Sequence, residues 1–216
     1  MDRICIISWD KLHKPETEYI CGIPLLRTGA LRTRRRIRRF IMHNRIDGAV
    51  MEGDTPDFAI SELERASVPV FTGERLMEVL YPAFISRAAK LGKGIDTCTI
   101  YTTSVTHRTV EIIRCAAAHF RHVALCTDDD AEHPVRELMD SMGLTLKIGD
   151  SGGVGIICSG THPKSLLTID LTSACTATFA DENRRIITPA IAEALAGENL
   201  DGDILTRLGL KINSLC

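Results

Sequence analysis

The fold is decided by the stretch Thr97-Cys98-Thr99-Ile100-Tyr101, a short apolar run followed by the polar turn Thr102-Thr103-Ser104-Val105-Thr106-His107. Apolar residues recur at helical spacing after this turn and predict a helix over about 106–120. The apolar run at 122–126 predicts the next strand. Short buried strands that alternate with amphipathic helices are typical of a parallel α/β sheet, so we expect this half of the chain to be an α/β domain.

Further strands are expected at 144–148, 154–158 and 166–171, and Thr188-Pro189 should start a helix that Gly197 ends. Only Gly149-Asp150-Ser151-Gly152-Gly153 separates the first two of these strands. A parallel crossover usually takes a dozen residues or more, whereas five Gly-rich residues suit a hairpin turn. Either this sheet contains an antiparallel pair, or one of the two segments is not a strand.

The same alternation extends toward the N-terminus. Strands are expected at 3–8, 48–51 and 68–71, and helices at 31–44, after Thr55, and at 74–91. Thr55 is expected to cap its helix with Pro56 at the first position, Pro82 to kink or split the long helix, and Gly92 to end it in a left-handed conformation. We therefore predict two α/β domains, a small one at 1–93 and a Rossmann-like one at 94–216 that has a mostly parallel sheet and C-terminal helices.

A family resemblance agrees with this fold. The runs Gly155-Ile156-Ile157-Cys158-Ser159-Gly160-Thr161 and Leu166-Leu167-Thr168-Ile169-Asp170-Leu171 form a strand with a small-residue turn, followed by a Leu-Ile-Asp strand. With the elements from Thr97 onward, this order resembles the nicotinamide-binding domain of glutamyl-tRNA reductase and shikimate dehydrogenase. The resemblance implies a Rossmann-like domain.

The cofactor fingerprint of such domains is missing. A dinucleotide binder needs Gly-x-Gly-x-x-Gly after the first strand so that the backbone can approach the pyrophosphate. The turn from Thr102 to His107 has no glycine, although its hydroxyls and helix N-terminal amides can hold another anion. The cofactor is left unknown, and NAD or NADP stays open without being favoured.

Composition excludes several classes of protein. The formal net charge of −2 gives no general attraction to nucleic acid or anionic membrane, and no apolar run approaches the length of a membrane helix. Four of the eight cysteines, Cys5, Cys98, Cys126 and Cys158, lie in apolar strands and no Cys-x-x-Cys pair occurs, which favours reduced thiols. We expect a soluble, cytoplasmic protein.

Ligands of open α/β sheets lie beyond the carboxyl ends of the strands. The polar residues expected there are the candidate ligand-binding residues, and we predict that they line a cleft between the two domains: Asp10, Glu52, Asp54, Thr103, Ser104, His107 and Asp128. Asp128 is in the position of an acid that holds a ribose hydroxyl, but the run Asp128-Asp129-Asp130 favours a solvated loop. His107, His133 and His162 lack metal-ligand spacing, so no metal site is predicted.

An arginine-rich stretch extends from Arg27 to Arg45, with no acidic residue between Glu18 and Asp47. Its arginines could bind the phosphate groups of a nucleic acid or of a phosphorylated metabolite. The interleaved aromatic residues and the recognised module of a nucleic-acid-binding protein are missing. We expect a solvated helix paired with acidic neighbours, either of the same chain or of a second copy in a homo-oligomer, and no tight binding of nucleic acid.

These observations leave the function open. The leading hypothesis is a Rossmann-like protein that binds a small anionic ligand or serves as a non-enzymatic scaffold. The alternatives are an NAD(P)-dependent dehydrogenase-like enzyme with an altered cofactor loop, and nucleic-acid binding through the arginine-rich helix. The sequence does not decide whether the protein is an enzyme.

Overall fold

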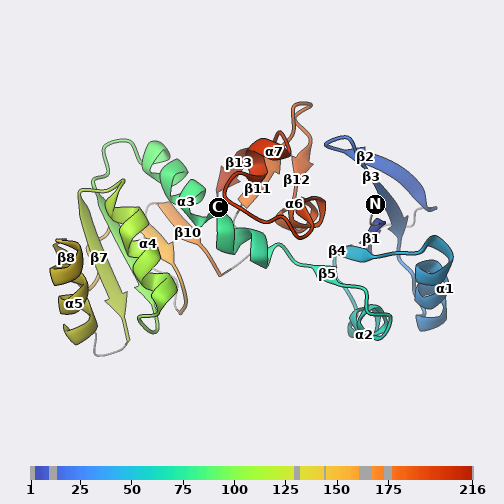
Figure 1. Cartoon of the computed structure of the whole chain (residues 1–216), viewed down its shortest axis with the longest axis horizontal. Helices are drawn as coiled ribbons and strands as arrows, with labels where there is room; N and C mark the ends of the chain where they lie inside the picture. Colours follow the sequence, from blue (N-terminus) through green and yellow to red (C-terminus); the bar gives the residue numbers. More distant parts are fainter. Residues whose placement is uncertain are drawn as a thin grey trace. The chain divides into compact units, whose positions relative to one another are not determined.

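The computed structural model of the chain describes residues 3–9, 14–128, 132–143, 145–160, 167–172 and 177–215. Contacts within the chain divide it into two compact units, Met1–Leu76 with Phe179–Lys211 and Met77–Thr178 with Ile212–Cys216. Each unit holds one five-stranded sheet (Figure 1). The α/β class and the mostly parallel sheet predicted from the sequence are confirmed.

The division between the units differs from the expected boundary after residue 93. It falls inside helix α3 (Glu74–Leu91), and the segment Phe179–Lys211 belongs with the first unit. Grouping by contacts does not test whether a segment folds on its own, so the domain limits 1–93 and 94–216 stay a prediction.

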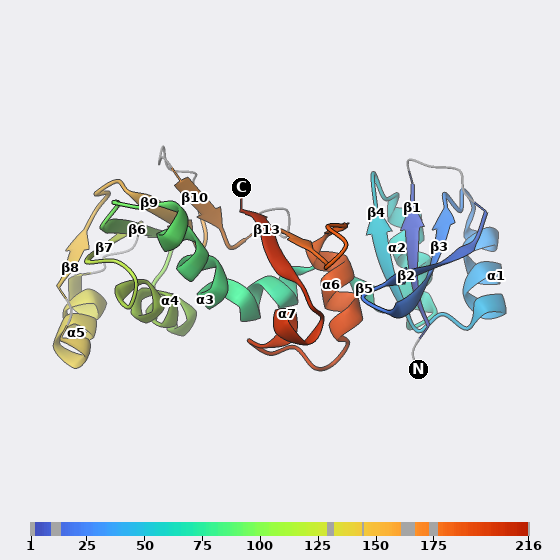
Figure 2. The same cartoon turned by 90° about the horizontal axis from the view of Figure 1, so that it is seen from above.

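The first sheet has the order β2-β3-β1-β4-β5. Its strands are β1 (Ile4–Ser8), β2 (Glu16–Ile20), β3 (Ile23–Gly29), β4 (Gly48–Glu52) and β5 (Val70–Phe71). Only β2 is antiparallel to its neighbour, and Figure 2 shows β1, β3 and β4 side by side. The β2–β3 hairpin was not predicted from the sequence, although Cys21-Gly22 is a two-residue turn that ends in glycine; both residues have positive φ, 50° and 77°.

Helices α1 (Arg34–Asn44) and α2 (Asp57–Arg65) cover one face of this sheet. The hydroxyl of Thr33 caps α1 by accepting from the N–H of Arg36, at 3.3 Å. The expected cap of α2 is wrong. Pro56 takes the cap position without a side-chain bond, and the Thr55 hydroxyl instead donates to the carbonyl of Gly53, at 3.3 Å.

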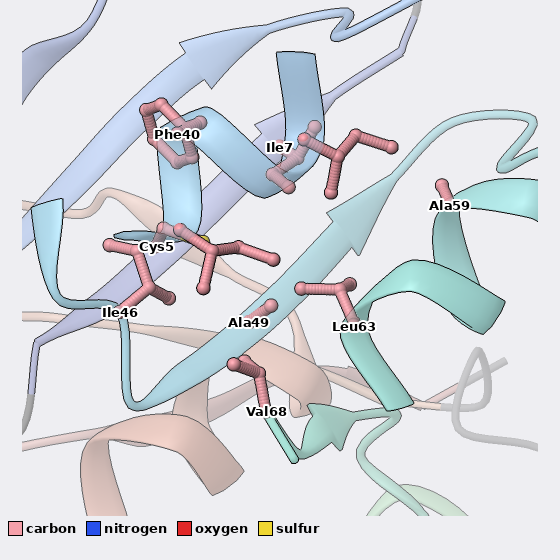
Figure 3. Close-up of a cluster of buried hydrophobic side chains, with 10 residues drawn as sticks. Cys5, Ile7, Phe40, Ile46, Ala49, Ala59, Leu63 and Val68 are labelled. Atoms are coloured by element: carbon pink, nitrogen blue, oxygen red, sulfur yellow. The ribbon is translucent and has the colours of Figure 1, made fainter. Parts of the chain in front are cut away.

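The core of the first unit follows the strand and helix periodicities (Figure 3). Cys5 and Ile7, two residues apart on β1, lie on the same face of the sheet as Ala49 of β4. Phe40 of α1 and Leu63 of α2 pack against them. The apolar stripe of α1 is used completely in this contact, so its arginines are left on the outside.

Helix α3 runs without a break through Pro82, so of the two expected outcomes the split is wrong and the kink stays a prediction. The left-handed glycine beyond it is Gly94, with a φ of 90°, rather than Gly92. Before α3, Gly73 also has a φ of 90°, and a Cβ there would lie 2.6 Å from the Cβ of Pro189. Helix α6 (Pro189–Ala196) therefore packs directly against the start of α3, where only glycine fits.

The second sheet has the order β10-β9-β6-β7-β8, and all of its pairs are parallel. Its strands are β6 (Thr97–Thr102), β7 (His122–Thr127), β8 (Leu146–Ile148), β9 (Val154–Ile157) and β10 (Leu167–Asp170). Helices α4 (His107–Ala117) and α5 (Glu132–Met142) form the first two crossovers. When the five strands are numbered 1 to 5 along the chain, their order across the sheet from β8 to β10 is 3-2-1-4-5. This is the Rossmann arrangement.

Both explanations offered for the short link between β8 and β9 are wrong, because both segments are strands of one parallel sheet. The link crosses the face of β6 without a helix. The hydroxyl of Thr99 donates to the carbonyl of Gly152 at 2.9 Å, and that of Tyr101 donates to Asp150 Oδ1 at 2.9 Å. A Cβ on Gly153, whose φ is 81°, would lie 2.1 Å from the carbonyl oxygen of Thr97. Glycine lets the link lie flat on the strand, so a helix is not needed.

The end of the chain adds a small sheet with the order β12-β11-β13 and a short helix. These elements are β11 (Ala177–Ala180), β12 (Ile186–Ile187), α7 (Ile204–Arg207) and β13 (Lys211–Leu215). The C-terminal helices predicted from the sequence include α6, whereas β11 and β12 were not predicted. Within the described residues no helix is both long and apolar enough to cross a membrane.

Candidate functional site

The carboxyl edge of a sheet is here the edge at which its parallel strands end. In the first unit this edge carries an ionic network at the ends of β1 and β4. Ser8 and Arg27 both donate to Glu52 Oε2, each at 2.6 Å. Arg27 also donates to the Ser8 hydroxyl, at 3.1 Å. One carboxylate oxygen of the predicted residue Glu52 is therefore committed to structure.

The network continues away from the edge through two more ion pairs. Glu18 of β2 accepts from Arg27 Nε at 2.6 Å and from Arg185 at 3.0 Å. Burial lowers the pKa of Arg27, but its bonds to Glu18 and Glu52 outweigh this effect and raise the pKa above its usual value. Two carboxylates and two guanidinium groups balance one another, so this edge has little net attraction for a charged ligand.

The other predicted residues of this edge stand apart from the network. Asp54 is exposed beyond Gly53 and makes no ion pair among the described residues. Asp10 lies outside the described residues. Its neighbour Trp9 is half-buried and packs edge-on against Phe58 with the ring centres 6.1 Å apart. Of the residues predicted for this edge, Glu52 therefore belongs to the network and Asp54 does not.

In the second unit the carboxyl edge is built from hydroxyl groups. Thr102 ends β6, and its hydroxyl donates to the carbonyl of Ser104 at 2.7 Å. The Ser159 hydroxyl, just beyond β9, accepts from the N–H of Thr103 at 2.9 Å and lies 2.9 Å from the Thr103 hydroxyl. These bonds join the ends of β6 and β9, while the predicted residues Thr103 and Ser104 stay exposed to solvent.

Helix α4 begins at this edge. The Thr106 hydroxyl accepts from the N–H of Thr109 at 3.2 Å, and the Thr109 hydroxyl accepts from the N–H of Thr106 at 3.2 Å. Because these groups bond to each other, the N–H groups of His107 and Arg108 are the donors of the first turn that have no partner among the described residues. The first turn contains no acidic residue. The side chain of His107 is 87% exposed and lies 3.9 Å from Glu111.

Arg108 of α4 was not among the residues predicted for this edge. Its Nη1 donates to Glu78 of α3 at 3.2 Å, whereas its Nη2 is buried and has no hydrogen-bond partner among the described residues. Burial raises the pKa of the Cys158 thiol, just after β9, to about 12. The positive charge of Arg108 lies close enough to oppose part of this rise. An arginine at the second position of a helix that follows a hydroxyl-rich turn was the available signal.

Asp128 follows β7 at the same edge. Thr127 pairs with Thr102 in the parallel register, so Asp128 and Thr103 directly follow the ends of two adjacent strands. The Asp128 side chain is exposed. Thr103, Ser104, His107 and Asp128 therefore come together at one edge of the second sheet, whereas Glu52 and Asp54 belong to the edge of the first sheet. That the two edges line a common cleft stays a prediction.

Two hollows in the first unit lie away from the predicted residues. They have volumes of about 590 and 520 Å³, and they share Asp181, Glu182, Thr206 and Gly209 in their linings. Their arginines are largely engaged, since Arg207 pairs with Asp201 at 2.8 Å. Among the described residues no group of three His, Cys, Asp or Glu side chains is arranged for a metal ion; His162 and the side chain of His133 fall outside the described part of the chain.

No protein-family model and no curated protein sequence matches the chain. Among solved structures it is similar to L-tryptophan dehydrogenase from Nostoc punctiforme, with 13% identity over 74% of this chain and 57% of that chain and a TM-score of 0.32. It is also similar to the catalytic subunit of aspartate transcarbamoylase from M. jannaschii, with 10% identity over 72% and 61% and a TM-score of 0.27. A third is the chorismate mutase/shikimate 5-dehydrogenase fusion protein from Clostridium acetobutylicum, with 11% identity over 74% and 68% and a TM-score of 0.26.

The chain thus spans less than two thirds of the length of the first two structures. Likeness at these identities and TM-scores carries no argument about function. The Rossmann-like character expected from the sequence is confirmed at the level of the fold, by the strand order and parallel pairing of the second sheet.

Proposed function

We propose that the second unit binds a small anionic ligand at the carboxyl edge of its sheet, over the N-terminus of α4. The observation that carries the proposal is the composition of this edge. Hydroxyl groups, two helix N–H donors and a guanidinium group gather there, and the first turn of α4 has no carboxylate.

Topology supports this position. The chain leaves β6 toward β7 on one side, and β9 lies on the other side of β6. The strand order therefore reverses between β6 and β9, and ligands of open α/β sheets bind at such switch points. Thr103 and Ser159, which are bonded to each other, mark this point at the edge.

The chemistry of the edge favours a phosphate or carboxylate group. A helix N-terminus carries about half a positive charge, and its free N–H groups point at the ligand. Arg108 adds one guanidinium donor, because its buried Nη2 has no partner in the described structure, whereas its Nη1 is bonded to Glu78. The exposed hydroxyls of Thr103 and Ser104 complete a shell of donors.

A nicotinamide dinucleotide is the second candidate ligand, and Asp128 is the observation that favours it. Its carboxylate follows β7 next to Thr103, where a ribose hydroxyl is held in Rossmann domains. Every residue from Thr102 to His107 carries a side chain, which hinders close approach of a pyrophosphate. A smaller anion therefore remains the leading ligand class.

Thermal unfolding of the full chain with a panel of phosphate, sulfate, citrate, nucleoside phosphates, NADH and NADPH tests the proposal. A ligand at 100 times its Kd stabilises the protein by about 2.7 kcal/mol, which gives a clear shift in Tm. We expect stabilisation by at least one anion and its loss in Thr103→Asp, which places a carboxylate at the edge. Thr145→Asp is the matched control, because Thr145 is exposed and precedes β8 at the opposite edge of the same sheet.

The outcomes separate the hypotheses. Stabilisation by NADH or NADPH that greatly exceeds that by simple anions, and that is lost in Asp128→Asn, would favour the dehydrogenase-like alternative. If no member of the panel raises Tm, or if Thr103→Asp and Thr145→Asp behave alike, anion binding at this edge is rejected and the non-enzymatic scaffold becomes the preferred reading.

A further inference from the structure

Helix α1 exposes a face that joins arginines to an apolar side chain. Arg35, Arg38, Arg39 and Met42 occupy positions i, i+3, i+4 and i+7, which places them on one side of the helix. Met42 is 78% exposed. The core-facing side is taken up by Ile37, Phe40 and Ile41, so this opposite face contributes nothing to the core.

Most of the positive charge on this face is not neutralised. Glu62 of α2 is fully buried and pairs with Arg38, with Arg65 at 2.9 Å and with Arg34 at 4.0 Å. The hydrogen bond from Arg38 holds the pKa of Glu62 below its usual value, so this carboxylate stays ionised. One carboxylate thus forms ion pairs with three guanidinium groups. Arg35 and Arg39 form no ion pair within the described part of the chain.

A hollow of about 380 Å³ opens between the two helices at the same place. Its lining is both apolar and basic: Arg38, Ile41, Met42, Glu62, Arg65 and Ala66. The exposed acid Glu64 is two residues from Glu62, which turns it to the other side of α2. The rim of the hollow is therefore basic; the buried Ile41 contributes to its apolar floor, and Ala66 is an exposed residue of the lining.

We infer that this α1–α2 face binds an acidic, partly apolar segment of a partner protein. Charge complementarity requires an acidic partner, because three guanidinium groups share one buried carboxylate and two more arginines are unpaired. The exposed methionine and the apolar floor require apolar side chains in the same segment, since Met adapts its shape to such contacts.

A protein segment fits this face better than a nucleic acid does. The aromatic residues of the two helices, Phe40 and Phe58, pack against the core, so the face presents no ring for stacking on bases. The net charge of −2 for the whole chain gives no broad attraction to a polyanion. An exposed Met42 would gain nothing from contact with phosphates.

Fluorescence anisotropy with the full chain tests this inference. The probe is a labelled amphipathic helical peptide of about 15 residues, with glutamates along one face and leucines along the other. We expect Arg35→Glu/Arg39→Glu to weaken binding at least about tenfold and Met42→Gln to weaken it about threefold. The matched control is Arg184→Glu/Lys211→Glu, which makes the same change of net charge at exposed residues outside α1 and α2 and should change affinity less than about twofold.

Each other result would overturn the inference. Failure of the wild-type chain to bind the peptide would leave α1 as a solvated helix. Equal competition by single-stranded DNA of matched charge at about 0.15 M salt, with no effect of Met42→Gln, would assign the face to nucleic acid. A self-associated chain that Arg35→Glu/Arg39→Glu returns to monomer would assign it to a second copy.

Discussion

The carboxyl edges of the two five-stranded sheets satisfy their polar groups by different means. In the first unit the edge is ionic, because Arg27 bonds to both Glu18 and Glu52 and the charges cancel. In the second unit the edge is rich in hydroxyl groups: Ser159 joins the turn at Thr103, no carboxylate enters the first turn of α4, and the predicted acid Asp128 is exposed beyond β7. Both edges end parallel strands that are buried in a helix-covered sheet.

The difference indicates different uses of the same architectural position. A carboxylate and a guanidinium group that pair with each other stabilise the strand ends but leave little charge for a ligand. Hydroxyls and helix N–H groups that lack a counter-charge are preorganised for an anion. We therefore expect substitutions at the first edge to act on stability, and substitutions at the second edge to act on binding.

The largest expected effect concerns the link between β8 and β9, which crosses the second sheet without a helix. Gly153→Ala forces a Cβ against the carbonyl of Thr97, only 2.1 Å away, at a φ of 81°. We expect a loss of at least about 4 kcal/mol in the free energy of unfolding, measured by urea denaturation.

Gly152→Ala is the matched control for this prediction. Gly152 has a φ of 72°, but nothing lies within 4 Å of a Cβ there. Only the left-handed backbone should then cost free energy, about 1 kcal/mol. Equal losses for the two variants would mean that the link from 149 to 153 does not lie on β6.

The next effect in size concerns the ionic edge. Arg27→Met keeps the aliphatic stem but leaves Glu52 with Ser8 alone, and it should lower the free energy of unfolding by about 2–3 kcal/mol. Arg27→Met/Glu52→Gln should regain part of this loss, because an unpaired carboxylate is then gone.

Arg108→Met is the corresponding change at the hydroxyl edge. Its single exposed ion pair with Glu78 predicts a stability loss below about 1 kcal/mol, while affinity for the stabilising anion should fall about tenfold. A large loss of stability in this variant, with unchanged anion affinity, would contradict the distinction between the two edges.

The elements with a strong local signal were predictable from the sequence. Helix α3 has the bounds expected from its apolar spacing, and Thr188-Pro189 marks the start of α6. Strands β6, β7 and β9 lie within a residue of their apolar runs. Local signals failed where a distant partner decides the structure, as in the link over β6, which depends on hydroxyl bonds from Thr99 and Tyr101.

For the candidate site, the sequence predicted which residues lie at the edge of a sheet but not which groups they bond to. Polar residues after apolar strands placed Thr103, Ser104 and Asp128 together because parallel strands end at one edge. The neutralisation of Glu52 depends on Arg27, which the chain brings to it through the unexpected β2–β3 hairpin. Sequence spacing carries no information on such a pairing, so the ion pair of Glu52 could not be predicted, and ligand binding by Glu52 stays a prediction.

The smallest expected effect is a change in pH dependence, and it compares two ways of holding a buried carboxylate in the first unit. Glu193 of α6 accepts from the N–H of Gly73 at 2.7 Å and is nearly fully buried. Burial raises its pKa, whereas the hydrogen bond from Arg38 lowers the pKa of the equally buried Glu62. One carboxylate is held by backbone N–H groups and the other by arginines.

The two carboxylates should therefore contribute opposite pH slopes to the free energy of unfolding. A raised pKa in the folded state contributes stability below the unfolded pKa of about 4.5 that is lost as pH rises through the folded value. The free energy of Glu193→Gln minus that of the wild type should then increase as pH rises through this window. For Glu62 the lowered pKa contributes stability above about 4.5 that is lost as pH falls through the folded value, so the same difference for Glu62→Gln should increase as pH falls. Urea denaturation of the three proteins at a series of pH values measures both slopes, and slopes of the same sign would show that burial rather than the bonding partner governs these carboxylates.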